Sequence, residues 1–126
     1  MKPAADLVLK PAARRRLLED VSRAYPSEAC GALLGRADQV VGVHPLPNRS
    51  PDPRSSFTIA PDDLEPLLRG EADGEPAVIG FYHSHPDCDP GPSARDLEAA
   101  WPGYWYVVVG IERGRAGAPH AWRVDG

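Results

Sequence analysis

The chain is organised around the stretch AVIGFYHSHP, residues 77–86. Its first six residues are apolar and rich in β-branched and aromatic side chains, which predicts a buried strand. If this strand continues through His85, the two-residue period of a strand places His83 and His85 on the same face. Two histidines at a strand end are either a polar surface pair or candidate metal ligands.

A helix is predicted shortly after the histidines. A Gly-Pro pair at residues 91–92 breaks the chain, and the sequence SARDLEAA at residues 93–100 has helical character. Ser93 and Asp96 have the spacing of a capping box, with Ser93 as the N-cap. Asp96 can also turn back from the first turn of this helix as a third metal ligand. Three protein ligands and one water are the coordination of a catalytic zinc site rather than a structural one.

The length predicts one domain over residues 1–126. The chain is 42% hydrophobic and 25% charged, which is ordinary for a globular protein. Its net charge of −4 argues against nucleic acid as the main partner. No apolar run is long enough for a membrane span, and the N-terminus lacks the apolar core of a signal peptide. We therefore expect a cytoplasmic protein with reduced cysteines.

The remaining sequence predicts strands and helices in alternation. Proline suits the first position of a helix, so Pro11 and Pro61 each mark a helix start. The continuous apolar run over residues 104–111 predicts a strand covered on both faces. The other expected elements are a short strand at 7–9, a hairpin of strands at 30–35 and 39–46, a short strand at 55–60, a turn at 114–119 and a closing strand at 120–124. This order predicts an α/β fold with a mixed β-sheet flanked by helices.

The motif as a whole resembles a known family. HSHP at residues 83–86, followed by Ser93 and Asp96, and preceded by a glutamate within YPSEACGALLG at residues 25–35, resembles the JAMM/MPN zinc metallopeptidases. The resemblance covers nearly the whole chain, and the spacing from His83 to Asp96 matches without a gap. It implies the JAMM/MPN architecture, which is distantly similar to that of cytidine deaminases. The deaminase signature, H-x-E with P-C-x-x-C, is absent.

The resemblance also implies a role for each site residue. His83, His85 and Asp96 would bind one Zn²⁺ per chain, Glu28 would be the general acid and base, and Ser93 would stabilise the oxyanion. The chemistry is consistent with these roles, because zinc lowers the pKa of bound water and a carboxylate that does not bind the metal can move its proton. Without the motif, Glu28 would be interpreted as an exposed residue at a strand start.

The other cysteines and histidines carry weaker signals. Cys88, three residues after His85, could replace Asp96 as the third ligand or remain a free thiol near the site. Cys30 is expected to face the core. His44 and His120 have no motif around them and are expected to be surface or packing residues.

The resemblance is to the short stand-alone prokaryotic type of the family. It implies hydrolysis of the amide or isopeptide bond after the C-terminal Gly-Gly of a small ubiquitin-like or sulfur-carrier protein. Glycine fits this site because it lets a backbone approach the metal closely, and the tail is expected to lie as an added strand on an exposed edge. Two alternatives stay open: a non-catalytic MPN-type protein-binding module, and a zinc peptidase acting on an unrelated peptide such as that of a cell wall. A DNA-repair role is disfavoured by the acidic composition.

Overall fold

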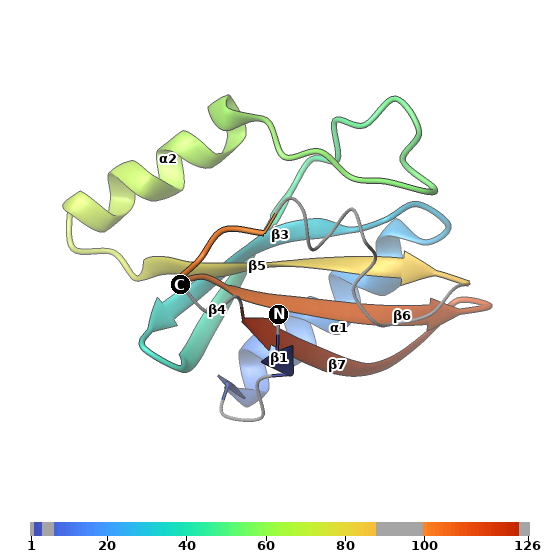
Figure 1. Cartoon of the computed structure of the whole chain (residues 1–126), viewed down its shortest axis with the longest axis horizontal. Coiled ribbons are helices and arrows are strands. Elements are labelled where there is room, and N and C mark those ends of the chain that lie inside the picture. Colours follow the sequence, from blue (N-terminus) through green and yellow to red (C-terminus); the bar gives the residue numbers. More distant parts are fainter. Residues whose placement is uncertain (1, 4–6, 88–99, 124–126) are drawn as a thin grey trace.

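The structure, a computed structural model, describes residues 2–3, 7–87 and 100–123. Within these residues, seven strands form one sheet in the order β1-β7-β6-β5-β3-β4-β2 (Figure 1). The strands are β1 Lys2–Pro3, β2 Val8–Leu9, β3 Cys30–Arg36, β4 Gln39–Leu46, β5 Ala77–Pro86, β6 Trp105–Glu112 and β7 Arg115–Arg123. The helices are α1 Pro11–Ala24 and α2 Pro61–Ala72.

The sheet is mixed, as the sequence predicts. The strand β5 pairs in parallel with β6 and antiparallel with β3, and β2 pairs in parallel with β4. The hairpin of β3 and β4 and the pair of β6 and β7 are antiparallel. The strand with the two histidines is therefore central and has a hydrogen-bonded neighbour on each side (Figure 1). The predicted α/β class is confirmed.

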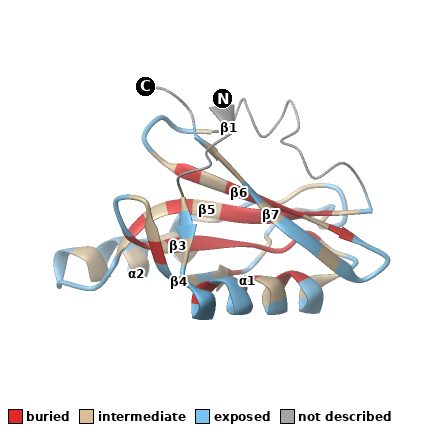
Figure 2. Cartoon of the chain, turned by 90° about the horizontal axis from the view of Figure 1, so that it is seen from below, coloured by how far each residue is buried: buried red, intermediate tan, exposed pale blue. Residues whose placement is uncertain are grey.

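The sheet buries apolar side chains on both of its faces. One cluster joins residues of α1 to Leu33 and Tyr82, and a second joins Leu64 and Leu67 of α2 to Ala32 and, at its margin, Phe81. Because neighbouring residues of a strand point to opposite faces, these two clusters lie on opposite sides of the sheet. The buried residues are concentrated on β3, β5 and β6 and on the sheet-facing side of α1 (Figure 2). Val107, Val108 and Val109 are all buried, which confirms the strand expected to be covered on both faces.

A polar contact fastens α1 to the central strand. The fully buried Tyr82 donates its hydroxyl to Asp20 Oδ2 at 2.7 Å, and burial together with this bond raises the pKa of Tyr82. The Tyr82 ring also lies against the backbone of Gly31, where an added Cβ would be 2.4 Å from the ring. Only glycine leaves room for such an approach. Tyr82 and His83 point to opposite faces of β5. The face that carries Tyr82 is therefore tightly packed behind the histidine.

The predicted strand at residues 55–60 is wrong. These residues form a turn and an irregular segment between β4 and α2. Their polar backbone groups are satisfied locally, since the Thr58 N–H donates to Asn48 Oδ1 and the Ser56 N–H to Asp52 O. Side-chain bonds of this kind offer the backbone an alternative to a ladder.

The predicted turn at residues 114–119 is also wrong. The turn is the two-residue pair Arg113 and Gly114, both with positive φ (51° and 81°), and β7 begins at Arg115. Two consecutive residues with positive φ are the geometry of a tight hairpin whose twist matches the flanking strands. The long strand β7 replaces the shorter closing strand expected at 120–124.

Residues 93–99 of the predicted helix, and Val124 of the closing strand, lie outside the described residues. No helix within the described ranges is long and apolar enough to cross a membrane.

Candidate active site

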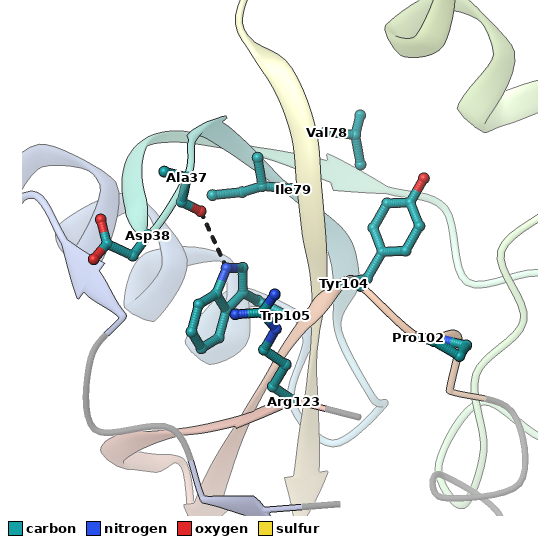
Figure 3. Close-up of a pocket in the computed structure, with 9 residues that line it drawn as sticks. Ala37, Asp38, Val78, Ile79, Pro102, Tyr104, Trp105 and Arg123 are labelled. Carbon is teal, nitrogen blue, oxygen red and sulfur yellow. Dashed lines mark hydrogen bonds between the residues drawn. The ribbon is translucent and has the colours of Figure 1, made fainter. Parts of the chain in front are cut away.

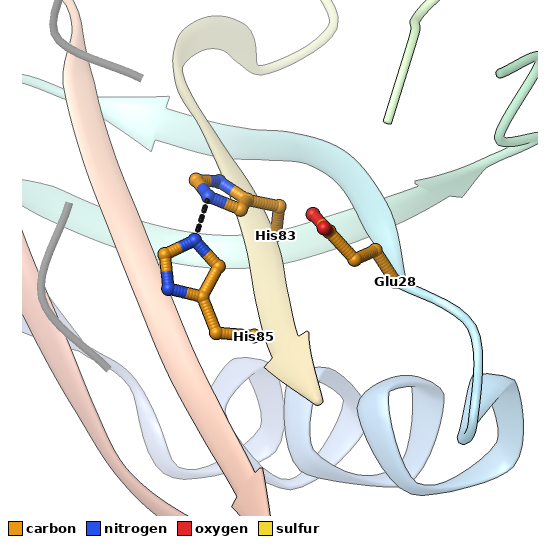
Figure 4. Close-up of side chains that lie close together, drawn as sticks. All are labelled: Glu28, His83 and His85. Atoms are coloured by element: carbon orange, nitrogen blue, oxygen red, sulfur yellow. Dashed lines mark hydrogen bonds between the residues drawn. The ribbon is translucent and has the colours of Figure 1, made fainter. Parts of the chain in front are cut away.

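The two histidines of the HSHP motif converge near the C-terminal end of β5. His83 and His85 are 3% and 7% exposed, and their Nε2 atoms are 3.0 Å apart (Figure 4). The predicted common face is therefore present, and the pair is buried rather than a surface decoration. At most one proton fits between two imidazole nitrogens at this separation, so the pair can share a proton or bind one cation.

Glu28 joins the histidines from another part of the chain. It lies just before β3, is 6% exposed, and directs its carboxylate toward His83 (Figure 4). One ligand atom from each of Glu28, His83 and His85 lies within 4.8 Å of the other two. A charged carboxylate is rarely buried unless it is paired or near a metal. The structure thus brings together three of the five residues that the sequence singles out.

This group fits a divalent cation. Two nitrogens that are each about 2.0–2.1 Å from one tetrahedral zinc ion are about 3.3 Å apart. The observed 3.0 Å between the His83 and His85 Nε2 atoms is close to that value. Histidine nitrogens with a carboxylate are the ligand types that zinc prefers. Glu28 can act either as a ligand or as a base beside the metal, and the geometry alone permits both.

Ser84, between the two histidines, joins β5 to the segment that carries Glu28. Its fully buried hydroxyl accepts the Ala29 N–H at 2.8 Å, and its own N–H donates to Ala29 O at 3.1 Å. These two bonds extend the contact between β3 and β5 beyond the first residue of β3, Cys30. They hold Ala29, the residue after Glu28, directly beside Ser84 of the histidine strand.

The irregular segment 47–60 contacts both sides of the site. Asn48 Nδ2 donates to Glu28 O at 3.1 Å, and the Glu28 N–H donates to Pro53 O at 2.7 Å. Phe57 stacks on His83, with ring centroids 4.4 Å apart and an interplanar angle of 25°. Neither Asn48 nor Phe57 was expected at the site from the sequence. A signal was nevertheless present, because Phe57 is the one aromatic residue in a long polar stretch and Asn48 is of a type that organises loops.

Asp87, the residue after HSHP, fixes the end of the histidine strand. It has a positive φ of 54° and accepts the Tyr25 hydroxyl at 2.6 Å and the Arg113 N–H at 2.8 Å. Both bonds favour the ionised carboxylate, and they lower the pKa of Asp87. The end of α1, the end of β5 and the turn between β6 and β7 therefore meet at one carboxylate.

The other predicted residues fall into two groups. Ser93, Asp96 and Cys88 lie outside the described residues. Cys30 is buried, as expected, and desolvation raises the pKa of its thiol to about 12, so it stays neutral. His44 and His120 are exposed, as expected for residues with no motif.

A hollow lies at the opposite end of β5, beside Val78 and Ile79 (Figure 3). Trp105 donates its Nε1–H to Ala37 O at 3.1 Å there, and the guanidinium carbon of Arg123 lies 4.8 Å from the indole centroid. Its described lining residues include no histidine or cysteine. The hollow is therefore separate from the histidine group in position and in chemistry.

Comparison with known families agrees with this geometry. Residues 10–125 match the family described as prokaryotic homologs of the JAB domain. The chain belongs to this family.

Named relatives and solved structures place the chain more closely. It is 43% identical over 104 residues to a protein of Haloferax volcanii named desampylase, covering 79% of this chain and 73% of that protein. It is 34% identical over 106 residues to a probable TtuB-protein conjugate cleaving protease of Thermus thermophilus, covering 81% and 71%. A solved protein of Desulfitobacterium hafniense superimposes with a TM-score of 0.79 at 27% identity, covering 93% and 83%. A JAB1/MPN domain protein of Archaeoglobus fulgidus, 19% identical, shares the fold with a TM-score of 0.64 over 95% and 90%.

Proposed function

We propose that this chain is a zinc metallopeptidase of JAMM type, formed as one domain over residues 1–126. Its reaction is hydrolysis of the amide or isopeptide bond after the C-terminal Gly-Gly of a small ubiquitin-like or sulfur-carrier protein. The observation that carries this proposal is the buried convergence of Glu28, His83 and His85 from two separate segments. Two histidines and a carboxylate whose ligand atoms lie within 4.8 Å of one another are ligand types that zinc prefers, so the arrangement favours a metal-dependent function.

The relatives support the substrate class. One is named a desampylase, and another a probable protease that cleaves conjugates of the protein TtuB. The aligned region covers more than two thirds of the length of each relative, so the similarity is not confined to a short motif. The proposed partner is therefore a small protein with a diglycine tail, joined to a target or to further residues.

Each site residue has a proposed role. His83, His85 and Asp96 would hold one zinc ion. When bound, zinc lowers the pKa of a coordinated water toward about 7 and polarises the scissile carbonyl. The Glu28 carboxylate takes a proton from the attacking water and then delivers it to the leaving amine. The Ser93 hydroxyl donates a hydrogen bond to the carbonyl oxygen as negative charge builds there.

The Ser93 role gives a first prediction. Ser93→Ala should lower kcat by about 10² to 10³-fold with zinc retained, because one donor to the oxyanion is lost. A lost N-cap would instead lower stability by about 1 kcal/mol and leave kcat of the folded enzyme unchanged. Steady-state kinetics and thermal unfolding of the same sample separate the two roles. An unchanged kcat would remove Ser93 from the mechanism and leave it as a helix cap.

Two features of the fold support the proposed preference for a diglycine tail. The strand β5 has a strand on each side, so its backbone is not open to a substrate tail, and the tail would pair with another segment that borders the site. A carbonyl that must reach the buried histidines tolerates little bulk at the last residue. The final glycine is thus the residue on which cleavage should depend most.

This dependence supplies the test of the substrate class. Fusions of sulfur-carrier and ubiquitin-like proteins should be cleaved after Gly-Gly, and changing the last glycine to alanine should lower kcat/KM by about 10²-fold, because a methyl group misplaces the carbonyl. Mass spectrometry of the products identifies the cleaved bond. Equal cleavage of both fusions, or cleavage only at unrelated sequences, would refute the diglycine assignment while leaving zinc chemistry intact.

A further inference from the structure

The segment 48–58 forms hydrogen bonds with Glu28 and is not itself a strand of the sheet. Asn48 Nδ2 donates to Glu28 O at 3.1 Å and to Ser56 O at 3.0 Å, with Pro53 O at 3.5 Å. Its Oδ1 accepts the N–H groups of Ser50 and Thr58. One side chain therefore satisfies the backbone of its own segment and reaches across to the residue that carries the candidate base.

Both peptide groups of Glu28 depend on this segment. The Glu28 C=O accepts from Asn48, and the Glu28 N–H donates to Pro53 O at 2.7 Å. Pro53 O is itself within reach of the Asn48 amide. With both of its peptide groups bonded, the Glu28 backbone has little freedom to rotate, so the Cα–Cβ bond from which the carboxylate extends keeps a fixed direction.

The same segment fixes one of the histidines. The half-buried Phe57 lies nearly parallel to the His83 imidazole, with centroids 4.4 Å apart. Stacking on one face of the ring restricts its rotation and keeps water from that face. Segment 48–58 thus contacts the candidate base through Asn48 and the candidate metal ligand through Phe57.

We propose that Asn48 and Phe57 are positioning residues, which set the Glu28 carboxylate and the His83 ring relative to each other. The proposal rests on the proposed function. Groups that orient metal ligands typically change metal affinity or activity by about 10- to 100-fold when altered. Misplacing a catalytic group by about 1 Å has an effect of similar size.

The experiment uses the full chain in three variants and a control. Asn48→Asp keeps the shape and the acceptor but removes the amide donor that reaches Glu28. Phe57→Leu keeps an apolar side chain but removes the flat ring, and Phe57→Tyr restores the ring. Ser55→Ala is the matched control, because Ser55 is exposed, lies in the same segment and bonds to Asp52 rather than to the site.

Three quantities are measured on each variant: kcat and KM on a Gly-Gly fusion, zinc affinity by chelator competition with the metal-free chain, and the melting temperature. Asn48→Asp should lower kcat by about 10- to 100-fold with KM and bound zinc unchanged. Phe57→Leu should weaken zinc binding by about 10-fold or more, and Phe57→Tyr should restore it. Ser55→Ala should match the wild type.

A purely structural role gives a different result. The melting temperatures would fall, while kcat and zinc affinity of the folded variants would match the wild type, and the proposal would be overturned. If Asn48→Asp fails to fold, the Phe57 pair decides, since equal zinc affinity of the leucine and tyrosine variants also overturns it. A wild-type chain that neither binds zinc nor cleaves the fusion would instead refute the proposed function itself.

Discussion

Glu28→Gln should abolish almost all hydrolysis while leaving the fold and the bound zinc in place. Glutamine is similar in size to glutamate but cannot accept the proton of the attacking water, and general acid–base catalysis contributes about 10² to 10⁴-fold. Glu28 is buried, and one of its carboxylate oxygens lies within 4.8 Å of a ring nitrogen of His83 and of His85. The substitution therefore acts at the site itself. Single-turnover cleavage of a Gly-Gly fusion, with zinc measured on the same sample, gives both quantities.

The same substitution distinguishes a base from a ligand. If Glu28 is a base, Glu28→Gln keeps about one zinc per chain and loses only turnover. If Glu28 is a ligand, zinc affinity falls together with activity, because an amide oxygen binds zinc less well than a carboxylate. Glu19→Gln is the matched control, since Glu19 is exposed on α1. Near-normal turnover of Glu28→Gln would exclude Glu28 from both roles.

The central strand could be predicted from the sequence because its signals are local. An apolar run followed by His-x-His determines a buried strand whose alternate residues share a face, and the structure places His83 and His85 together as expected. The two proline-initiated helices and the hairpin of β3 and β4 were predicted for the same reason. The burial of Glu28 beside the histidines could not be predicted from local patterns. Only the family motif relates this residue before β3 to a strand 55 positions later.

The segment between β4 and α2 could not be predicted. Its composition favours a short strand at 55–60, but strand propensity says nothing of whether a partner strand is available. In the structure the potential ladder groups are bonded to Asn48 and to turn carbonyls instead. The turn of Arg113 and Gly114 was missed similarly, because an arginine with positive φ is uncommon and leaves little trace in the sequence.

The two alternatives to the proposed function make different demands on these residues. A protein-binding module needs the surface of the fold but not a buried acid next to two buried histidines. Such a module would keep partner affinity in Glu28→Gln and show no turnover in the wild type. A peptidase for an unrelated peptide would show the Glu28 effect but no preference for Gly-Gly over Gly-Ala. The mutation and the fusion panel together therefore separate the three functions.

Replacing both histidines should remove the metal altogether. The purified wild-type chain should carry about one zinc ion, and His83→Ala/His85→Ala should carry almost none, because a site left with at most one of its three proposed protein ligands cannot retain zinc. The loss should also lower the melting temperature, since metal bound only to the folded chain stabilises it, and a chelator should lower that of the wild type likewise. Elemental analysis and thermal unfolding measure the two effects.

The matched control for this result is His44→Ala/His120→Ala, which removes the two exposed histidines outside the motif. That variant should keep its zinc and its response to the chelator. The contrast matters because buried imidazoles stabilise a fold by packing as well, and His83→Ala/His85→Ala leaves cavities beside Phe57. Packing loss lowers the melting temperature with and without chelator equally, whereas metal loss removes the difference between the two conditions. Full zinc retention by His83→Ala/His85→Ala would show that the metal lies elsewhere and that the converging histidines serve another purpose.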